Sequence, residues 1–287
     1  NPLLEQSLKG TYMSTYQTLK GLKVKFLAAD TSGDRIKKGE IFYNSVAEGK
    51  IKVFVGVPTW ASGGNLDTAR NQIVAVGSQT ASIAFAGFDG TNRSALAEEY
   101  NGSAWTEVGD LNTARFNLQG FGISTAAIAV GGSAPSVTES WDGSSWTAVN
   151  NLNTTRANLA SAGIQTAGLA FGGNPSTTAS ESWDGTSWTA TNALPAAKGS
   201  LAGSGTQTSA LAFGANLPGP LASAESWDGT NWAATASMAT ARGYLGGCGI
   251  STASLAVGGS SNPAPGNIKA NTEEFSIADT LRAVDFD

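Results

Sequence analysis

Two sets of charged residues recur once in each of five similar segments, and they are the clearest candidates for chemistry in this chain. The basic set is Arg70, Arg115, Arg156, Lys198 and Arg242. The acidic set is Glu99 (or its neighbour Glu98), Glu139, Glu181, Glu225 and Glu273. A circle of cations could bind an anion at the mouth of a ring, but a planar guanidinium also suits a partly buried carboxylate. The regular spacing favours structural pairs between the two sets, with anion binding as the alternative.

Aromatic residues recur in pairs five positions apart and offer a second kind of chemistry. The first members are Tyr100, Trp141, Trp183 and Trp227. The second members are Trp105, Trp146, Trp188 and Trp232, and Trp60 has the same spacing to the segment that follows it. Exposed indoles could stack on sugar rings, one per repeat, as in a multivalent lectin, whereas buried aromatics dominate the energetics of a core. The repetition favours the core role.

Catalytic chemistry is poorly supported by the residue types present. The sequence has no histidine, which excludes Ser-His-Asp triads, Cys-His pairs and histidine-ligated zinc or copper. A carboxylate pair for glycoside hydrolysis is available in principle, but Asp142, Asp184 and Asp228 stand in turn contexts. No repeat has a glutamate that sets it apart from the others. We therefore expect no enzyme activity, no cofactor and no metal.

The one cysteine, Cys248, excludes an intrachain disulfide. Its neighbours are glycines and an isoleucine, so we expect an ordinary buried strand residue rather than a reactive thiol.

The candidate residues belong to a repeat of about 40 residues, a period typical of arrays of one supersecondary unit. Clear copies cover residues 111–146, 152–188 and 194–232. Each copy predicts four short strands, which in the first are placed at 115–118, at 126–132, at 139–141 and, after an Asp-Gly turn, from Trp146 onward. Four antiparallel strands of this size form one blade of a β-propeller.

The motif residues resemble those of kelch repeats. The resemblance rests on the Gly131-Gly132 pair after an apolar strand, on Glu139 two residues before Trp141, and on Trp146 beyond the turn, and it extends over roughly residues 60–276. It implies a β-propeller. The aromatic pair is slightly closer than in most kelch repeats, and the Trp-Asp dipeptides also suggest WD40 blades, whose Gly-His element this chain lacks. The copper oxidase activity known among kelch-like propellers needs histidine ligands and is not implied.

The fifth copy, residues 238–275, lacks its second tryptophan, and Thr280 stands where that residue is due. Trp60 lies six residues before Leu66, as Trp105 lies six before Leu111. A strand at 51–60 is therefore predicted to complete the last blade and to remove an open sheet edge. We predict an all-β fold, a five-bladed kelch-like β-propeller (51–287) closed by this N-terminal strand. A basic N-terminal arm with a hairpin (1–50) precedes it.

Charge is distributed unevenly along the chain. Residues 1–55 hold nine Lys/Arg against five Asp/Glu, and the remainder holds eight against seventeen. An acidic propeller lacks the clustered cations that phosphate contact needs, so we expect no nucleic-acid partner. No apolar stretch approaches the length of a membrane helix, so we expect no membrane insertion. The basic arm is either a solvated surface or a segment that docks on an acidic neighbouring protein.

The strands expected at 40–44 and 50–55 resemble a short hairpin common in bacteriophage tail-fibre and other virion proteins. With the Gly/Ser/Thr/Ala-rich array, this resemblance implies a non-catalytic structural or adhesion protein of a virion. The arm would attach to other virion proteins, and the propeller would bind a host-surface glycan or protein. The alternatives are a secreted or cell-surface carbohydrate-binding propeller without a virion role and, third, a glycan-acting enzyme. Selectivity is expected in the loops that vary between repeats, which are 87–96, 133–137, 174–179, 215–222 and 260–271.

Overall fold

The computed structural model describes residues 62–134, 136–261 and 268–277, together with the backbone of 24–27, 41–44 and 50–53. The chain divides into two compact units, Asn1–Ser62 and Gly63–Asp287. The described residues form strands, turns and loops, with no helix among them. The all-β prediction is therefore confirmed, and no described segment is a helix able to cross a membrane.

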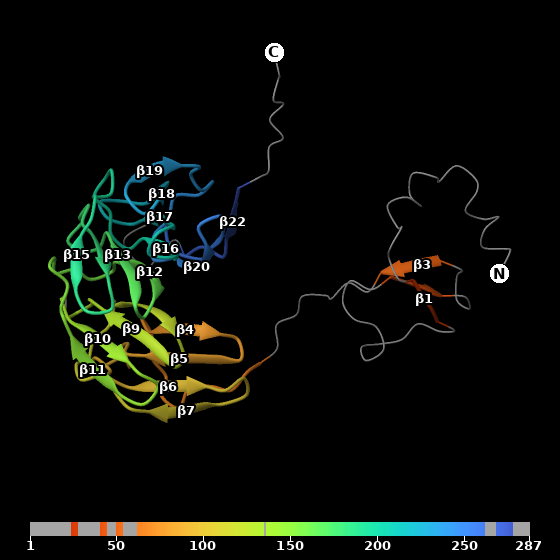
Figure 1. Cartoon of the computed structure of the whole chain (residues 1–287), viewed down its shortest axis with the longest axis horizontal. Coiled ribbons are helices and arrows are strands. Elements are labelled where there is room, and N and C mark those ends of the chain that lie inside the picture. Colours follow the sequence, from red (N-terminus) through yellow and green to blue (C-terminus); the bar gives the residue numbers. More distant parts are fainter. Residues whose placement is uncertain are drawn as a thin grey trace, which may run out of the picture. The chain divides into compact units, whose positions relative to one another are not determined.

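The larger unit is a five-bladed β-propeller, whose blades follow one another in chain order around an arc (Figure 1). Four blades are four-stranded antiparallel sheets, and the fifth has three strands in the described residues. The first three blades comprise β4 (Val74–Ser78), β5 (Ala81–Phe85), β6 (Ala97–Tyr100) and β7 (Trp105–Val108); β8 (Gln119–Ile123), β9 (Ala126–Val130), β10 (Thr138–Trp141) and β11 (Trp146–Val149); and β12 (Ala160–Ile164), β13 (Ala167–Phe171), β14 (Ser180–Trp183) and β15 (Trp188–Ala190). The last two comprise β16 (Ala202–Gly205), β17 (Ala210–Ala215), β18 (Leu221–Trp227) and β19 (Trp232–Thr235); and β20 (Gly246–Ile250), β21 (Ala253–Val257) and β22 (Thr272–Ser276).

The first strand of each blade lies nearest the propeller axis. These inner strands pack side by side in the series β4, β8, β12, β16 and β20. Small residues let them approach closely: a Cβ on Gly247 in β20 would stand 2.9 Å from the carbonyl oxygen of Gly203 in β16. The second strands, such as β9 and β13, are almost wholly buried, as expected for apolar strands covered by a blade on either side.

Asp-Gly turns join the third and fourth strands, as predicted. In the second blade Trp141 lies directly opposite Trp146 in the antiparallel register, and Gly143 takes a positive φ of 93°. This is the left-handed conformation that glycine adopts without a Cβ penalty. The turn therefore fixes the cross-strand pairing of the two tryptophans.

The predicted start of each first strand was wrong by several residues. Residues 115–118 are not in a strand, and β8 begins at Gln119. Asn117 takes a φ of 56°, which an extended strand cannot accommodate, and the segment instead turns Arg115 into the interior, where it is fully buried.

Cys248 is exposed, not buried as predicted. It lies in β20, all five residues of which are exposed. Figure 1 shows β20 at the end of the arc of blades, and its inner neighbour β16 lies on one side only. The sequence pattern of β20 matches that of the other inner strands, but its packing environment differs.

The smaller unit contains a three-stranded sheet. Strand β1 (Val24–Leu27) pairs in parallel with β2 (Ile41–Asn44), which pairs antiparallel with β3 (Lys50–Val53). The hairpin predicted between 40–44 and 50–55 is thus confirmed over the described residues. The rest of the predicted closing strand, including Trp60, lies outside the described residues, as does most of the predicted arm.

Candidate functional site

The repeated cations and carboxylates pair within each blade. The separations are 2.5 Å for Arg70–Glu98, 3.3 Å for Arg115–Glu139, 2.9 Å for Arg156–Glu181, 2.6 Å for Lys198–Glu225 and 2.7 Å for Arg242–Glu273. In the first blade the paired residue is Glu98, so the choice of Glu99 needs correction. Strand alternation explains it: Glu98 faces the interior, whereas Glu99 points to the other face of β6 and is half-buried.

The glutamates also hold the segment that leads from one blade into the next. Glu181 accepts hydrogen bonds from the backbone N–H groups of Asn153 (2.8 Å) and Thr154 (3.1 Å), as well as from Arg156. Glu139 likewise accepts the backbone N–H of Asn112 at 2.6 Å. These carboxylates are occupied by the framework, which leaves them unsuited to act as acids, bases or nucleophiles.

The arginines are equally committed to the interior. Arg156 donates to the carbonyls of Ala179 (2.9 Å) and Ala170 (3.3 Å) in addition to Glu181, and its side chain is fully buried. Burial lowers the pKa of Arg156 to about 10, although the nearby carboxylate opposes the shift. The guanidinium therefore stays charged at neutral pH, yet it is inaccessible to an anion. The geometry therefore supports structural ion pairs for this set of cations and not the binding of an external anion.

The fourth blade shows how lysine replaces arginine. Lys198 Nζ donates to both carboxylate oxygens of Glu225, at 2.8 and 2.6 Å, and to Ser223 Oγ at 2.9 Å. All three ammonium protons are thereby satisfied. Ser223 stands where the third blade has Ala179, so the lysine and the serine form a matched pair of changes.

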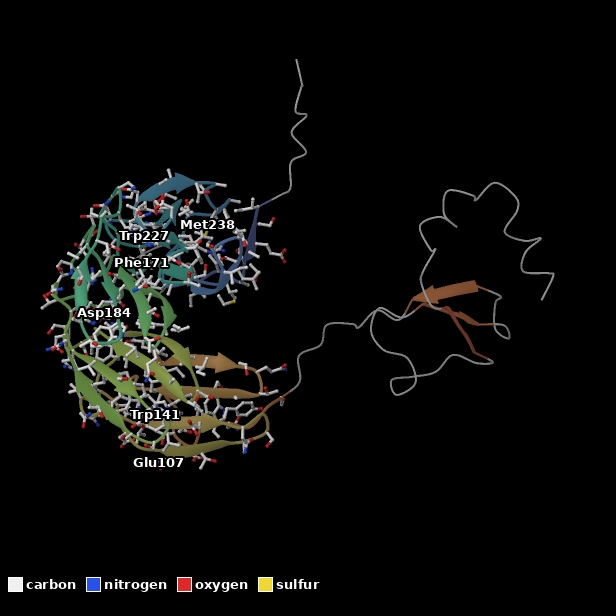
Figure 2. All side chains as sticks on the ribbon, viewed as in Figure 1. Glu107, Trp141, Phe171, Asp184, Trp227 and Met238 are labelled. Atoms are coloured by element: carbon white, nitrogen blue, oxygen red, sulfur yellow. The ribbon has the colours of Figure 1, made fainter. Side chains whose placement is uncertain are left out.

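Six tryptophans of the second, third and fourth blades are buried core residues, and several of them join neighbouring blades: Trp141, Trp146, Trp183, Trp188, Trp227 and Trp232. The Phe85 ring lies 4.8 Å from that of Trp146 in the next blade, and Phe171 lies 4.8 Å from Trp232. The Trp188 Nε1–H donates across the interface to Thr138 Oγ1 at 3.1 Å. Figure 2 shows Trp141, Phe171 and Trp227 within the body of the blades and Asp184 at its outer edge. Buried indoles of this kind offer no platform for a sugar.

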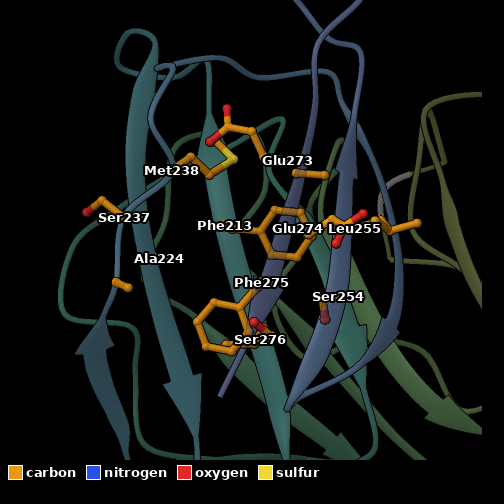
Figure 3. Close-up of a pocket in the computed structure, with 13 residues that line it drawn as sticks. Phe213, Ala224, Ser237, Met238, Ser254, Leu255, Glu273, Glu274, Phe275 and Ser276 are labelled. Carbon is orange, nitrogen blue, oxygen red and sulfur yellow. The ribbon is translucent and has the colours of Figure 1, made fainter. Parts of the chain in front are cut away.

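The fifth blade has an apolar cavity where the others have their second tryptophan. It has a volume of about 200 Å³ and is lined by Phe213 of β17, by residues of β21, by Phe275 of β22 and by Met238 in the connection between β19 and β20. Figure 3 shows the Phe213 and Phe275 side chains facing this space. Phe213 occupies the same repeat position as Phe171, and the Phe171 ring contacts Trp232. The cavity thus marks the place of the missing aromatic.

The repeated aspartates are turn residues. Asp142 Oδ1 accepts the backbone N–H groups of Ser144 and Ser145, both at 2.8 Å. A hydrogen bond from the Ser144 hydroxyl, together with these two backbone hydrogen bonds, lowers the pKa of Asp142 to about 2. Asp184 and Asp228 accept the equivalent pairs. Over the described part of the chain, no cluster of three or more Cys, Asp or Glu residues could hold a metal ion.

A different set of residues borders a cavity beside the inner strands. We call it the axial rim, and it consists of Gln72, Asn117, Asn158, Ser200 and Tyr244, each two positions after the repeated cation. All five have a positive φ, between 49° and 57°. The rim borders a cavity of about 240 Å³, whose other lining residues are Ile73, Leu118, Gln119, Leu159, Leu201 and Leu245.

Backbone hydrogen bonds connect the rim from blade to blade. The N–H of Tyr244 donates to the carbonyl of Ser200 at 2.9 Å, that of Ser200 to Asn158 at 2.9 Å, and that of Asn158 to Asn117 at 2.8 Å. The ladder accounts for the shared left-handed backbone. It places no requirement on the side chains, which differ in size and chemistry from blade to blade.

The variable loops lie at the same end as the rim. We call the connections between second and third strands the 2–3 loops. Each of three 2–3 loops forms an isolated β-bridge with the residue that directly precedes a rim residue. These bridges are Asn174–Ala157, Leu217–Gly199 and Ser260–Gly243. The Asp-Gly turns follow the third strands and lie at the other end of the blades. Variable residues thus gather at one end of the propeller.

Comparison with known proteins gives no family assignment. No family model and no curated protein matches the chain. The site must therefore be interpreted from its own chemistry.

The repeated residues predicted the framework but not the rim. The rim residues share a position in the repeat and vary in type, so no recurring residue marks them. Their fixed spacing of two residues from the repeated cation was visible in the sequence. Their left-handed backbone and their convergence on one cavity were not.

Proposed function

We propose that this protein is a non-catalytic structural and adhesion protein of a bacteriophage virion, a tail-fibre or decoration component. In this proposal its kelch-like propeller is displayed to bind a glycan or protein on the host surface. One observation carries the proposed binding role. The side chains that repeat in every blade are buried in the framework, whereas those that vary gather at the rim and 2–3 loops of one end.

Two features support the proposed place in a virion. The β2–β3 hairpin resembles a hairpin common in tail-fibre and other virion proteins. The first 55 residues carry a net positive charge, against a net negative charge in the rest of the chain, which suits attachment to an acidic neighbouring protein. The segment would join other virion proteins and leave the propeller free to face outward.

The virion assignment can be tested on assembled particles. Mass spectrometry should find the chain in purified particles, and the genes beside its coding sequence should encode tail or capsid proteins. The full chain carrying Lys37→Glu should be incorporated less than a matched Lys269→Glu variant of the propeller. A chain found only free outside the particle, among unrelated genes, contradicts the virion assignment.

A secreted or cell-surface lectin without a virion role is the second candidate, and the uncharged, amide-rich axial cavity favours it. A glycan array, combined with the particle experiment, distinguishes the virion protein from the free lectin. Glycan binding by a free chain that particles do not incorporate supports the lectin.

A further inference from the structure

We propose that the axial rim is a sugar-binding site for one neutral pyranose residue at the end of a glycan. This inference rests on the proposed binding function and deepens it by naming the site and the ligand class. No repeated framework residue takes part.

The lining chemistry selects the class of ligand. Gln72, Asn117, Asn158 and Gln119 present amides, which both donate and accept hydrogen bonds, and Tyr244 adds a phenol. The lining contains neither a cation nor a carboxylate, so nothing at the site would hold an anion or a metal ion. Vicinal hydroxyl groups of a sugar match paired amide groups, and the leucines beneath suit its C–H face. A cavity of about 240 Å³ is small for a drug-sized ligand and fits one small unit.

Ser200 gives an independent indication of a missing partner. Its side chain is only 4% exposed, and the Oγ atom has no hydrogen-bond partner in the described structure. Buried hydroxyls are normally satisfied by protein, water or ligand. Ser200 borders the cavity, but its Oγ atom is covered in the described structure, so a polar guest at the rim would reach this hydroxyl only after the Ser200 side chain rotates.

Tyr244, unlike the buried Ser200, is exposed at the cavity. The residue is 55% exposed, yet its backbone takes a φ of 52°, which is unusual for a bulky residue and costs stability. Asparagine, used at this position in two other blades, tolerates the conformation better. A strained and exposed tyrosine at a cavity mouth fits a role in stacking on a sugar ring.

The experiment compares rim variants of the full chain with a matched control. The probes are methyl glycosides of glucose, galactose, mannose and N-acetylglucosamine, measured by ligand-detected NMR, together with a glycan array. Tyr244→Asn removes the aromatic ring at a residue position where asparagine is favoured, and Asn158→Gly removes an amide while keeping the left-handed backbone. As the control, Ile250→Asn changes a residue of similar exposure, 58% against 55% for Tyr244, at the far end of β20.

The inference predicts that the unmodified chain binds at least one of these sugars. Both rim variants should lose about tenfold or more in affinity, as expected for an anchor residue, whereas Ile250→Asn should bind unchanged. Tyr244→Asn should melt at the same temperature or higher, so that lost binding is not lost folding.

Two results would overturn the inference. In the first, glycans bind equally well to the rim variants, which moves the site to the 2–3 loops and leaves the proposed adhesion function intact. In the second, no neutral sugar binds. Measuring attachment of the full chain to host cells in that case decides separately whether the adhesion function also fails.

Discussion

The ring of Phe171 in β13 packs against Trp232 in β19 of the next blade, with centroids 4.8 Å apart and planes inclined by 57°. Phe85 and Trp146 repeat this arrangement two interfaces earlier, at 4.8 Å and 59°. Tilted pairs at this distance are favourable beyond the area they bury. The aromatic residues that first suggested sugar stacking therefore serve to join the blades.

A double-mutant cycle measures this coupling. Phe171→Leu and Trp232→Leu should each destabilise the propeller, and the double variant should cost less than the two single costs together. The coupling should be about 0.5–1.5 kcal/mol, because the second substitution no longer breaks the aromatic pair. Urea unfolding of the four proteins gives the value, and strictly additive costs would contradict the proposed role of the pair.

Removal of the Arg156 guanidinium should be costly, since Glu181 would remain charged and buried. We expect Arg156→Ala to lower the free energy of unfolding by about 3–5 kcal/mol. Arg93→Ala, which removes an exposed arginine lying over the Phe116 ring, is the control and should cost under about 1 kcal/mol. Equal costs for Arg156→Ala and Arg93→Ala would show that the pair is not buried as described.

The Asp142 turn predicts a defined pH dependence. Because the folded pKa of about 2 lies below the ordinary value of 3.8, the unfolded chain binds more protons between these values. The contribution of Asp142 to stability is present above pH 4 and is lost as the pH falls towards 2. Carboxyl NMR should give a midpoint near 2, and Asp142→Asn should flatten the fall in the urea midpoint between pH 4 and 2. A midpoint near 3.8 would show that the turn hydrogen bonds do not persist in solution.

Completion of the fifth blade by Trp60 stays a prediction from sequence spacing. The apolar cavity beside Phe213 and Phe275 is consistent with a missing aromatic residue at this repeat position. Trp60→Ala should lower the unfolding free energy by about 3–5 kcal/mol, the usual cost of deleting a large core side chain. Trp60→Phe should retain most of that stability. A Trp60→Ala protein as stable as the original would contradict the predicted closure.

The number of blades and the roles of the repeated residues could be predicted because each signal occurs several times. One Trp-Asp-Gly-x-x-Trp segment predicts a hairpin, and its recurrence indicates a stack of like units that bury one another's faces. The pairing of Arg156 with Glu181 followed from their constant places in the repeat. Lys198 replaces arginine at the same repeat position, and Ser223, which accepts one of its hydrogen bonds, replaces the alanine found in the third blade.

Other features depend on three-dimensional context that no local pattern contains. Glu98 and Glu99 are adjacent acids, and only the orientation of β6 in the sheet determines which of them forms the ion pair with Arg70. Cys248 has the local sequence of a buried inner strand, but its exposure depends on what packs beside β20. The rim was missed because the positive φ at Tyr244 comes from a backbone ladder between blades, which no residue preference of tyrosine predicts.

Hydrogen exchange of the full chain, with and without the glycan that binds it best on an array, tests most directly that binding occurs at the variable end of the propeller. The account predicts ligand-dependent protection at the axial rim and the neighbouring 2–3 loops, with unchanged exchange in the Asp-Gly turns at 142–145, 184–187 and 228–231. Protection centred on those turns, or an array without a bound glycan and no attachment to host cells, would contradict it.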